Sequence, residues 1–261
     1  MLRFKNLGSG SAGNATLVEA RDGQQVSRLL IDCGLRVSEL RRRLQSAGLD
    51  LSDLDGLFVT HEHSDHVGHT HRFAQETGLP VWMSEGTRLA CQAELWGLPS
   101  GQLQTARDGV TFGLGALALH PFTVPHDARE PLQLRCSDGD RCLGVLTDLG
   151  HASAHVVQAL QGCHALLLEA NHDVGMLSRS SYPAFLRQRI AGPLGHLSNV
   201  DAAALLQAVH HPELSCVVAA HLSERNNTPS LAQAAFSAVL GCLAEDVLVA
   251  DPQTGSDWHT A

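Results

Sequence analysis

Apolar residues in the first 60 positions form short blocks of the length and alternation that are typical of β-strands. The expected strands here are Leu2–Leu7, Ala15–Ala20, Val26–Asp32 and Leu54–Thr60. The glycine-rich stretch Gly8–Asn14 and the turn Arg21-Asp22-Gly23 separate the first three. Between the third and the fourth, apolar residues four positions apart predict a helix that Ser38 caps and that runs through Ala47.

The remaining two thirds of the chain alternate between helical and extended patterns. The expected helices cover Val67–Thr77, Thr87–Leu95 and residues 153–161, 182–190, 200–209 and 230–240. The expected strands are Val81–Ser84, two strands between Val110 and Val124, Cys142–Thr147 after a hairpin turn at Ser137–Asp140, Ala165–Glu169, and residues 216–220 and 246–250. Strand-rich blocks followed by helices in both halves predict an α/β fold in which two sheets pack face to face with helices outside, a four-layered αββα sandwich. The length suits one domain over residues 1–261.

The composition excludes several classes of protein. No apolar run approaches the roughly 18–20 residues that span a bilayer, so we expect no membrane contact. The segment Met1–Gly8 lacks the features of a signal peptide, and we expect a cytoplasmic protein. A net charge of −9 argues against a generally basic surface that coats nucleic acid. It leaves room for a local basic groove, because bound divalent metals add positive charge there.

The cysteines do not form a recognisable framework. They are seven in number, scattered, and without a Cys-x-x-Cys pair, and most lie within apolar runs. We therefore expect buried free thiols rather than disulfides or a thiolate metal site.

The chemistry of the chain is concentrated in the run His61-Glu62-His63-Ser64-Asp65-His66, which directly follows an expected buried strand. Alternate residues on a turn present two imidazoles to one ion, while Asp65 and His66 turn toward a second position. Imidazole and carboxylate suit zinc and also accept manganese or iron. Three further residues, His126, Asp148 and His221, also follow apolar strands, and loops at strand ends can converge on one site.

This run resembles the signature of the metallo-β-lactamase superfamily. Further stretches resemble its YycJ/WalJ-type branch, which is similar to tRNA 3′-processing endonucleases and to phosphodiesterases of phosphonate breakdown. These stretches are Leu7–Asn14, Glu169–Asp173, Gly195–Asn199 and Ala220–Pro229. The resemblance implies two divalent ions, Zn or Mn. It implies that His61, His63 and His126 bind one metal, that Asp65, His66 and His221 bind the other, and that Asp148 bridges them.

The resemblance also implies a reaction. Two divalent ions about 3.5–4 Å apart generate a hydroxide that attacks a phosphorus or carbonyl centre, and Asp65 also orients it. The branch implies a phosphodiesterase, most concretely a 5′-to-3′ DNA exonuclease. By the same likeness His196 is a general acid or a phosphate ligand, with Ser198 and Asn199 as further substrate contacts. A second interpretation of this loop is that Ser198 or Asn199 caps the helix that begins near Val200, and the two interpretations are compatible.

Other polar residues have weaker assignments. Arg187 and Arg189, which with Arg179 precede His196, are placed to meet a phosphate backbone. His172 either orients a metal ligand from behind or belongs to a satisfied polar turn. The loop Gly8–Asn14 does not fit a nucleotide-binding fingerprint, and we expect a tight connection that brings Ser11 or Asn14 near the metals.

Three rival functions remain open: hydrolysis of a small cyclic phosphodiester, thioesterase or lactonase chemistry, and a non-catalytic regulatory role. The 72 residues between Asp148 and His221 leave no room for the inserted domain of β-CASP nucleases. No basic excursion resembles a tRNA-binding arm, and the lack of an export signal argues against a β-lactamase. The sequence leaves the oligomeric state undetermined.

Overall fold

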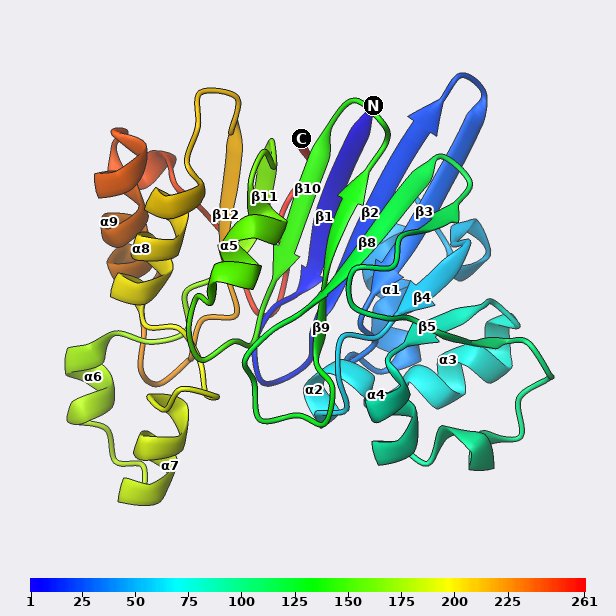
Figure 1. Ribbon diagram of the computed structural model, residues 1–261, viewed down its shortest axis with the longest axis horizontal. Coiled ribbons are helices and arrows are strands. Elements are labelled where there is room, and N and C mark those ends of the chain that lie inside the picture. The colour runs from blue at the N-terminus through cyan, green and yellow to red at the C-terminus, as the bar shows by residue number, and fades with distance from the viewer.

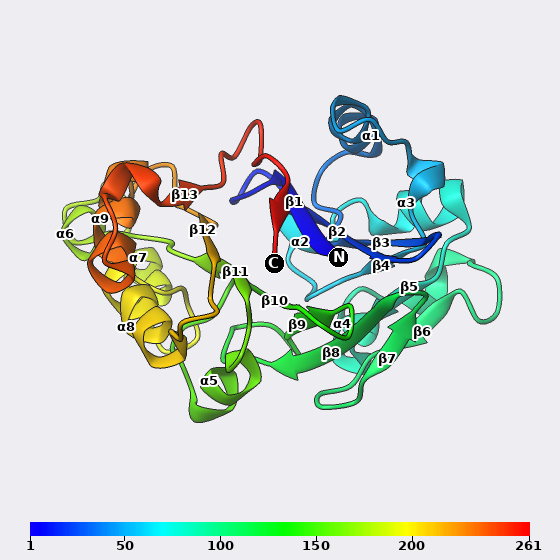
Figure 2. The ribbon, with the colours of Figure 1, turned by 90° about the horizontal axis from the view of Figure 1, so that it is seen from above.

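The computed structural model describes residues 1–261, and it contains two sheets of seven strands that pack face to face with helices on both outer faces (Figures 1 and 2). The first sheet has the order β14-β1-β2-β3-β4-β5-β6 and the second has the order β13-β12-β11-β10-β9-β8-β7. In each sheet antiparallel strands on one side give way to parallel strands on the other.

The strands of the first sheet are β1 (Leu2–Gly8), β2 (Ala15–Asp22), β3 (Gln25–Ile31), β4 (Gly56–Phe58), β5 (Val81–Met83), β6 (Leu103–Thr105) and β14 (His259–Thr260). Those of the second are β7 (Phe112–Leu114), β8 (Leu117–Thr123), β9 (Leu132–Ser137), β10 (Cys142–Leu146), β11 (Ala165–Glu169), β12 (Cys216–Ala220) and β13 (Leu248–Val249). The helices are α1 (Val37–Ser46), α2 (Ser64–Val67), α3 (Thr70–Thr77), α4 (Glu85–Ala90), α5 (Ala154–Leu160), α6 (Val174–Ser178), α7 (Ala184–Ile190), α8 (Asn199–Val209) and α9 (Pro229–Leu240).

Three apolar cores hold the layers together. The period of two along a strand sends neighbouring side chains to opposite faces, so on β2 Val18 joins the core between the sheets and Leu17 joins the core under α1 and α3. A third core lies between the second sheet and the helices α5, α8 and α9, and the fully buried Phe236 belongs to it. The expectation of an α/β sandwich in four layers is therefore confirmed.

Several predicted boundaries are wrong, for local reasons. Ser38 does not cap α1, because that helix begins at Val37 after Arg36. The helix expected over Val67–Thr77 is split into α2 and α3. The chain breaks there because the Cys33 amide donates to the His66 carbonyl while the His69 amide donates to the Cys33 carbonyl.

The helix expected over Thr87–Leu95 is also divided. Ser84 caps α4 by accepting the Thr87 amide, and Gln92 at a positive φ of 50° then leads into a 3₁₀ turn over Ala93–Trp96. The expected strand Leu54–Thr60 shortens to β4. The short elements β6, β14 and α6 were not predicted, because two to five residues carry too little periodicity.

All seven cysteines are free thiols, three of them buried. None of the helices has the length and apolar character needed to cross a membrane.

Candidate metal centre

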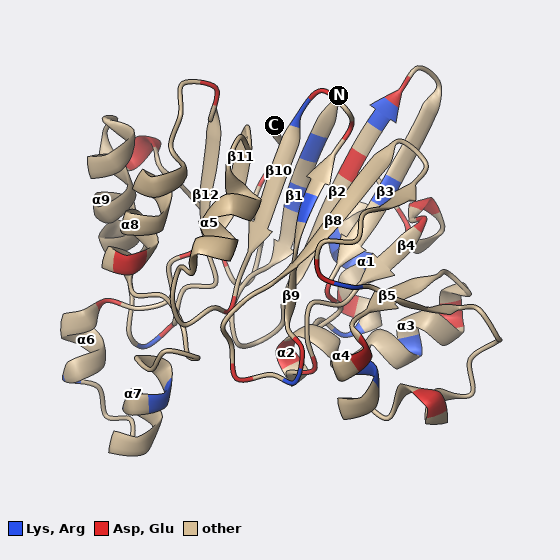
Figure 3. Cartoon of the chain, viewed as in Figure 1, with Lys and Arg blue, Asp and Glu red and all other residues tan.

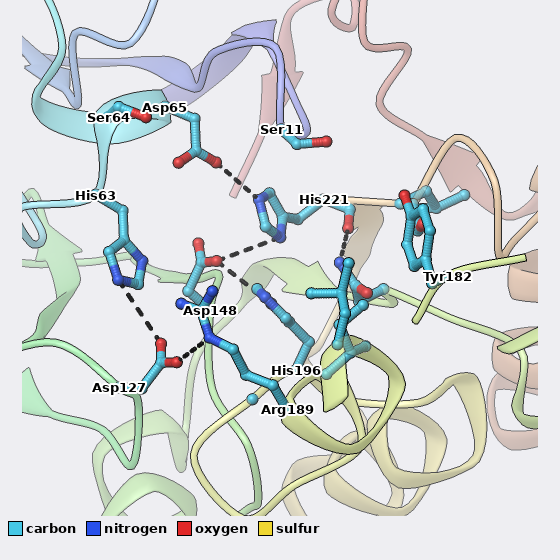
Figure 4. Close-up of a pocket in the computed structure, with 16 residues that line it drawn as sticks. Ser11, His63, Ser64, Asp65, Asp127, Asp148, Tyr182, Arg189, His196 and His221 are labelled. Carbon is cyan, nitrogen blue, oxygen red and sulfur yellow. Dashed lines mark hydrogen bonds and ion pairs between the residues drawn. The ribbon is translucent and has the colours of Figure 1, made fainter. Parts of the chain in front are cut away.

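The motif residues converge at one edge of the sandwich, where strands of both sheets end. His61 follows β4, His126 follows β8, Asp148 follows β10 and His221 follows β12. Asp65 and His66 lie on α2. Together with α7 these segments enclose a pocket of about 370 Å³, into which Asp65, Asp148, His196 and His221 point (Figure 4).

The structure brings the predicted ligands together in the predicted groups. The donor atoms of His61, His63 and His126 all lie within 4.8 Å of one another, and the same holds for Asp65, His66 and His221. Asp148 lies between the groups. One of its oxygens is 2.9 Å from Nε2 of His66, and the other is 4.0 Å from Nε2 of His126.

The buried polar atoms of this cluster fit a metal ion. Nε2 of His61 and Nε2 of His221 are buried and have no hydrogen-bond partner in the protein. A buried polar atom without a partner costs about 1–3 kcal/mol, so native structures rarely leave two in one pocket. A divalent cation in each of the two histidine groups would satisfy these atoms, and imidazole with carboxylate is a donor set that such cations accept.

The histidines are held from behind by buried acceptors. Nδ1 of His66 lies 2.7 Å from Asp32, and the Thr60 hydroxyl donates to the same carboxylate while it lies 3.0 Å from Nδ1 of His61. Nδ1 of His126 lies 3.1 Å from the Gly195 carbonyl. An N–H held at Nδ1 leaves Nε2 free as a ligand, which is how metal-binding histidines are commonly oriented.

Glu169 is the centre of the largest such network. It ends β11, is fully buried, and places one oxygen 2.9 Å from Nδ1 of both His196 and His221. Its carboxylate also accepts the backbone amides of Asp148, Leu149 and Leu197. One carboxylate thus fixes two imidazoles and the loop after β10.

The backbone is strained at the same place. Asp32, Asp148 and His221 have φ values of 64°, 58° and 56°, a left-handed conformation that non-glycine residues rarely adopt. Such residues cost of order 1–3 kcal/mol each and persist where surrounding contacts enforce them, which is most often at functional sites.

Charge within the cluster is shared between histidines and carboxylates. Burial by itself lowers the pKa of His221, but Asp148, Asp65 and Glu169 outweigh it and raise that pKa to about 10. Burial opposes the charge of Glu169 too, yet His196 and His221 hold its pKa at about 2. Burial and the neighbouring His66 keep the pKa of His61 well below its usual value. Without metal, histidines of the pocket such as His221 therefore carry protons, and metal binding would release these protons.

The proposed substrate residues divide between two pockets. His196 lines the metal pocket, with Nδ1 3.4 Å from Asp148, and Arg189 lines it too, in an ion pair of 2.5 Å with Asp127. Arg187, Ser198 and His172 instead line a neighbouring pocket of about 440 Å³, which shares His196.

Two candidate residues, Ser198 and Asn199, have structural contacts, and a third, His172, has a ring nitrogen without a partner. Ser198 caps α8 by accepting the Asp201 amide, so the capping interpretation of this loop is confirmed. The Asn199 amide group exchanges two hydrogen bonds with Asn227 and does not line the metal pocket. Nδ1 of His172 is buried with no hydrogen-bond partner, so this nitrogen does not orient a metal ligand.

Some residues of the site were missed from the sequence. Asp32 and Glu169 orient the histidines, and Asp127 and Tyr182 line the pocket. Asp32 and Glu169 share a signal that identifies them, since each is an acidic residue that directly follows a run of at least three apolar residues of a strand. The glycine-rich loop behaves as expected, because Asn14 Nδ2 lies 3.0 Å from Nε2 of His66 and Ser11 lines the pocket.

Comparisons with known proteins agree with this geometry. A family model described as the metallo-beta-lactamase superfamily matches residues 8–168. Exodeoxyribonuclease YycJ of Bacillus anthracis is 35% identical over 239 residues, which cover 92% of this chain and 89% of that protein. Exodeoxyribonuclease WalJ of Streptococcus pneumoniae is 33% identical over 232 residues, 88% of this chain and 85% of that protein.

A solved structure supports the fold independently. Zn²⁺-bound PqqB of Methylobacterium extorquens superposes with a TM-score of 0.72 at 15% identity, over 99% of this chain and 100% of that one. The chain belongs to the metallo-beta-lactamase superfamily, in the branch that holds the YycJ and WalJ proteins, and is a metal-dependent hydrolase.

Proposed function

We propose that this protein is a dinuclear metal-dependent phosphodiesterase, and most concretely a 5′-to-3′ DNA exonuclease. The observation that carries the proposal is the complete set of seven donor residues converging on one pocket beside His196. The names of the two relatives at 33–35% identity support DNA as the substrate.

In this proposal His61, His63 and His126 hold one ion, Asp65, His66 and His221 hold the other, and Asp148 contacts both. Two divalent ions, Zn or Mn, lower the pKa of a water and stabilise charge on phosphate oxygens. The chain itself orients the groups. Asp65 orients the attacking water, and Glu169 holds His196 with Nε2 facing the substrate.

His196 is the proposed proton donor to the leaving oxygen. We expect His196→Ala to lower kcat about 10²-fold, a loss at the lower end for one general acid, while the metal content stays unchanged. The pH profile of kcat distinguishes this role from a structural one. The fall of kcat at high pH, which reports loss of the proton from the general acid, should disappear in the variant only if His196 donates that proton. The matched control is His151→Ala, whose side chain is exposed and lines neither pocket.

Arg187 and Arg189 are the proposed contacts to the DNA backbone. We expect Arg187→Ala and Arg189→Ala to weaken polynucleotide binding and to spare hydrolysis of bis(p-nitrophenyl) phosphate. Arg189 acts at the pocket mouth, and its loss should reduce the slope of log K against log salt by about one. Arg187 also donates to the Ser178 carbonyl at 2.9 Å, so its loss additionally loosens α7 from α6.

A third variant serves as the control for this pair. Arg72→Ala removes an exposed arginine on α3 and should change neither binding nor its salt dependence. Equal losses on DNA and on the small diester would contradict the assignment of Arg187 and Arg189.

The direct test of the function uses end-labelled single- and double-stranded DNA, with 5′-phosphate or 5′-hydroxyl ends, in Mn²⁺ or Zn²⁺. We expect stepwise loss of nucleotides from the 5′ end. An Asp65→Ala, His66→Ala double variant prepared in the same way controls for contaminating nuclease. If a preparation that carries two metals leaves every DNA intact, the proposal is wrong and a small phosphodiester becomes the leading substrate.

A further inference from the structure

The positive charge of the chain beyond Arg141 is gathered on one lobe, formed by α6, α7, the segments that join them to α8 and the first two residues of α8 (residues 174–200). After Arg141 the sequence has four arginines and no lysine. Three of them, Arg179, Arg187 and Arg189, lie in this lobe, and the fourth, Arg225, lies against it with its guanidinium 5.7 Å from the Tyr182 ring. Residues 174–200 contain no Asp or Glu, although the chain carries 27 of them; Asp173 and Asp201 bound this stretch, and Asp127 pairs with Arg189 (Figure 3).

The same lobe exposes an aromatic ring. Phe185 on α7 is 71% exposed, whereas five of the other six phenylalanines are fully buried and Phe112 is half-buried. None of the residues of α7 is buried, so this helix contributes little to the core. Of the eleven large apolar side chains that are exposed, four belong to residues 174–200, namely Val174, Phe185, Leu194 and Val200, and exposed apolar side chains gathered beside a pocket mark an interaction surface.

The exposed ring belongs to a segment that lines the metal pocket. Tyr182, Leu186, Arg189 and Ile190 line that pocket from the same segment. Phe185 precedes Leu186 and lies one helical turn before Arg189, so it flanks the row of residues that faces the metals. In Figure 4 Tyr182 lies beside His221, and Arg189 lies between His196 and Asp127.

We propose that this lobe binds a single-stranded nucleic-acid end, with Phe185 stacked on a nucleobase next to the phosphate that enters the metal centre. The proposal rests on the proposed phosphodiesterase function and extends it to a site for the bases. A polynucleotide matches both features of this surface, the exposed aromatic ring and the arginines. Its flat bases stack on aromatic rings, and its phosphates accept hydrogen bonds from arginines. A second copy of the chain matches it poorly, since a symmetric contact would bring the same arginines together.

The test uses substitutions at Phe185 that separate stacking from apolar contact. Phe185→Ala and Phe185→Leu should each raise the KM for a single-stranded oligonucleotide about tenfold, because both lose the ring that stacks on the base. Phe185→Trp should keep the wild-type KM. Hydrolysis of bis(p-nitrophenyl) phosphate should be unchanged in all three. Leu243→Ala, which removes a side chain 64% exposed beyond the end of α9, is the control.

A readout without turnover keeps this inference apart from the function on which it rests. Binding of a phosphorothioate oligonucleotide should quench the tryptophan fluorescence of the Phe185→Trp protein more strongly than that of wild type, because the introduced indole stacks on a base. If wild-type enzyme degrades DNA but the Ala and Leu variants retain its KM and no additional quenching occurs, the stacking site is wrong and the nuclease stands. Quenching without degradation of any DNA would retain the site and remove the nuclease. Loss of a dimer in Phe185→Ala during sedimentation would assign the surface to self-association and overturn the proposal.

Discussion

Asp148→Asn is expected to lower DNA hydrolysis about 10³-fold, the rate equivalent of several kcal/mol of stabilisation by the metal centre. Asp148 lies between the two histidine groups, and its carboxylate approaches His66, His126, His196 and His221. Asparagine keeps the shape of the side chain and tolerates the positive φ of 58°, so the fold should survive. In the proposed dinuclear centre, the substitution removes one negative charge and the carboxylate oxygen that would be shared between the two ions.

Metal content measured by mass spectrometry should fall from two ions per chain to one or fewer, in parallel with the rate. Asp140→Asn, on the exposed hairpin turn between β9 and β10, should retain both metals and full activity. An Asp148→Asn protein that keeps two ions and more than a tenth of the wild-type rate would show that this carboxylate does not bridge them.

The sequence predicted the metal ligands that lie close together along the chain. The run from His61 to His66 places four donors on one turn after a strand. The positions of His126, Asp148 and His221 at the ends of strands indicate that they lie near this run. The structure has these residues in the expected groups. The sequence could not predict which other segments lie beside these ligands, because α6 and α7 are short and contain almost no buried residues.

The substrate roles of Ser198 and Asn199 stay predictions, and the structure adds a structural role for each, because Ser198 caps α8 and Asn199 pairs with Asn227. Asp32 and Glu169 were missed for a different reason. Each is a single acidic residue after apolar ones, and its partners lie far away in the sequence, such as His66, 34 positions from Asp32. Only the sheet order brings them together.

Glu169→Gln is expected to lower activity about 10³-fold, although Glu169 is not a proposed metal ligand. Its two oxygens accept five hydrogen bonds, from His196, His221 and three backbone amides. A glutamine has one accepting oxygen and an NH₂ group that faces donors, so at least two donors lose their acceptor. Loss of such outer contacts typically costs 10- to 100-fold in metal affinity, and misorientation of His196 adds a loss in proton transfer.

The stability of the metal-free protein gives a second readout with a defined pH dependence. Each unpaired buried donor costs about 1–3 kcal/mol, so we expect Glu169→Gln to lower the free energy of unfolding by about 3 kcal/mol at pH 7. The pKa of Glu169 is depressed from 4.5 to about 2, so its charge stabilises the fold above pH 4.5 and that contribution disappears as the pH falls toward 2. In urea denaturation the difference between wild type and variant should therefore be constant from pH 5 to 7 and shrink below pH 4.5. Glu213→Gln, an exposed residue before β12, should show no difference at any pH. A deficit that stays the same at pH 3 would mean that Glu169 stabilises the fold through packing rather than through its charge.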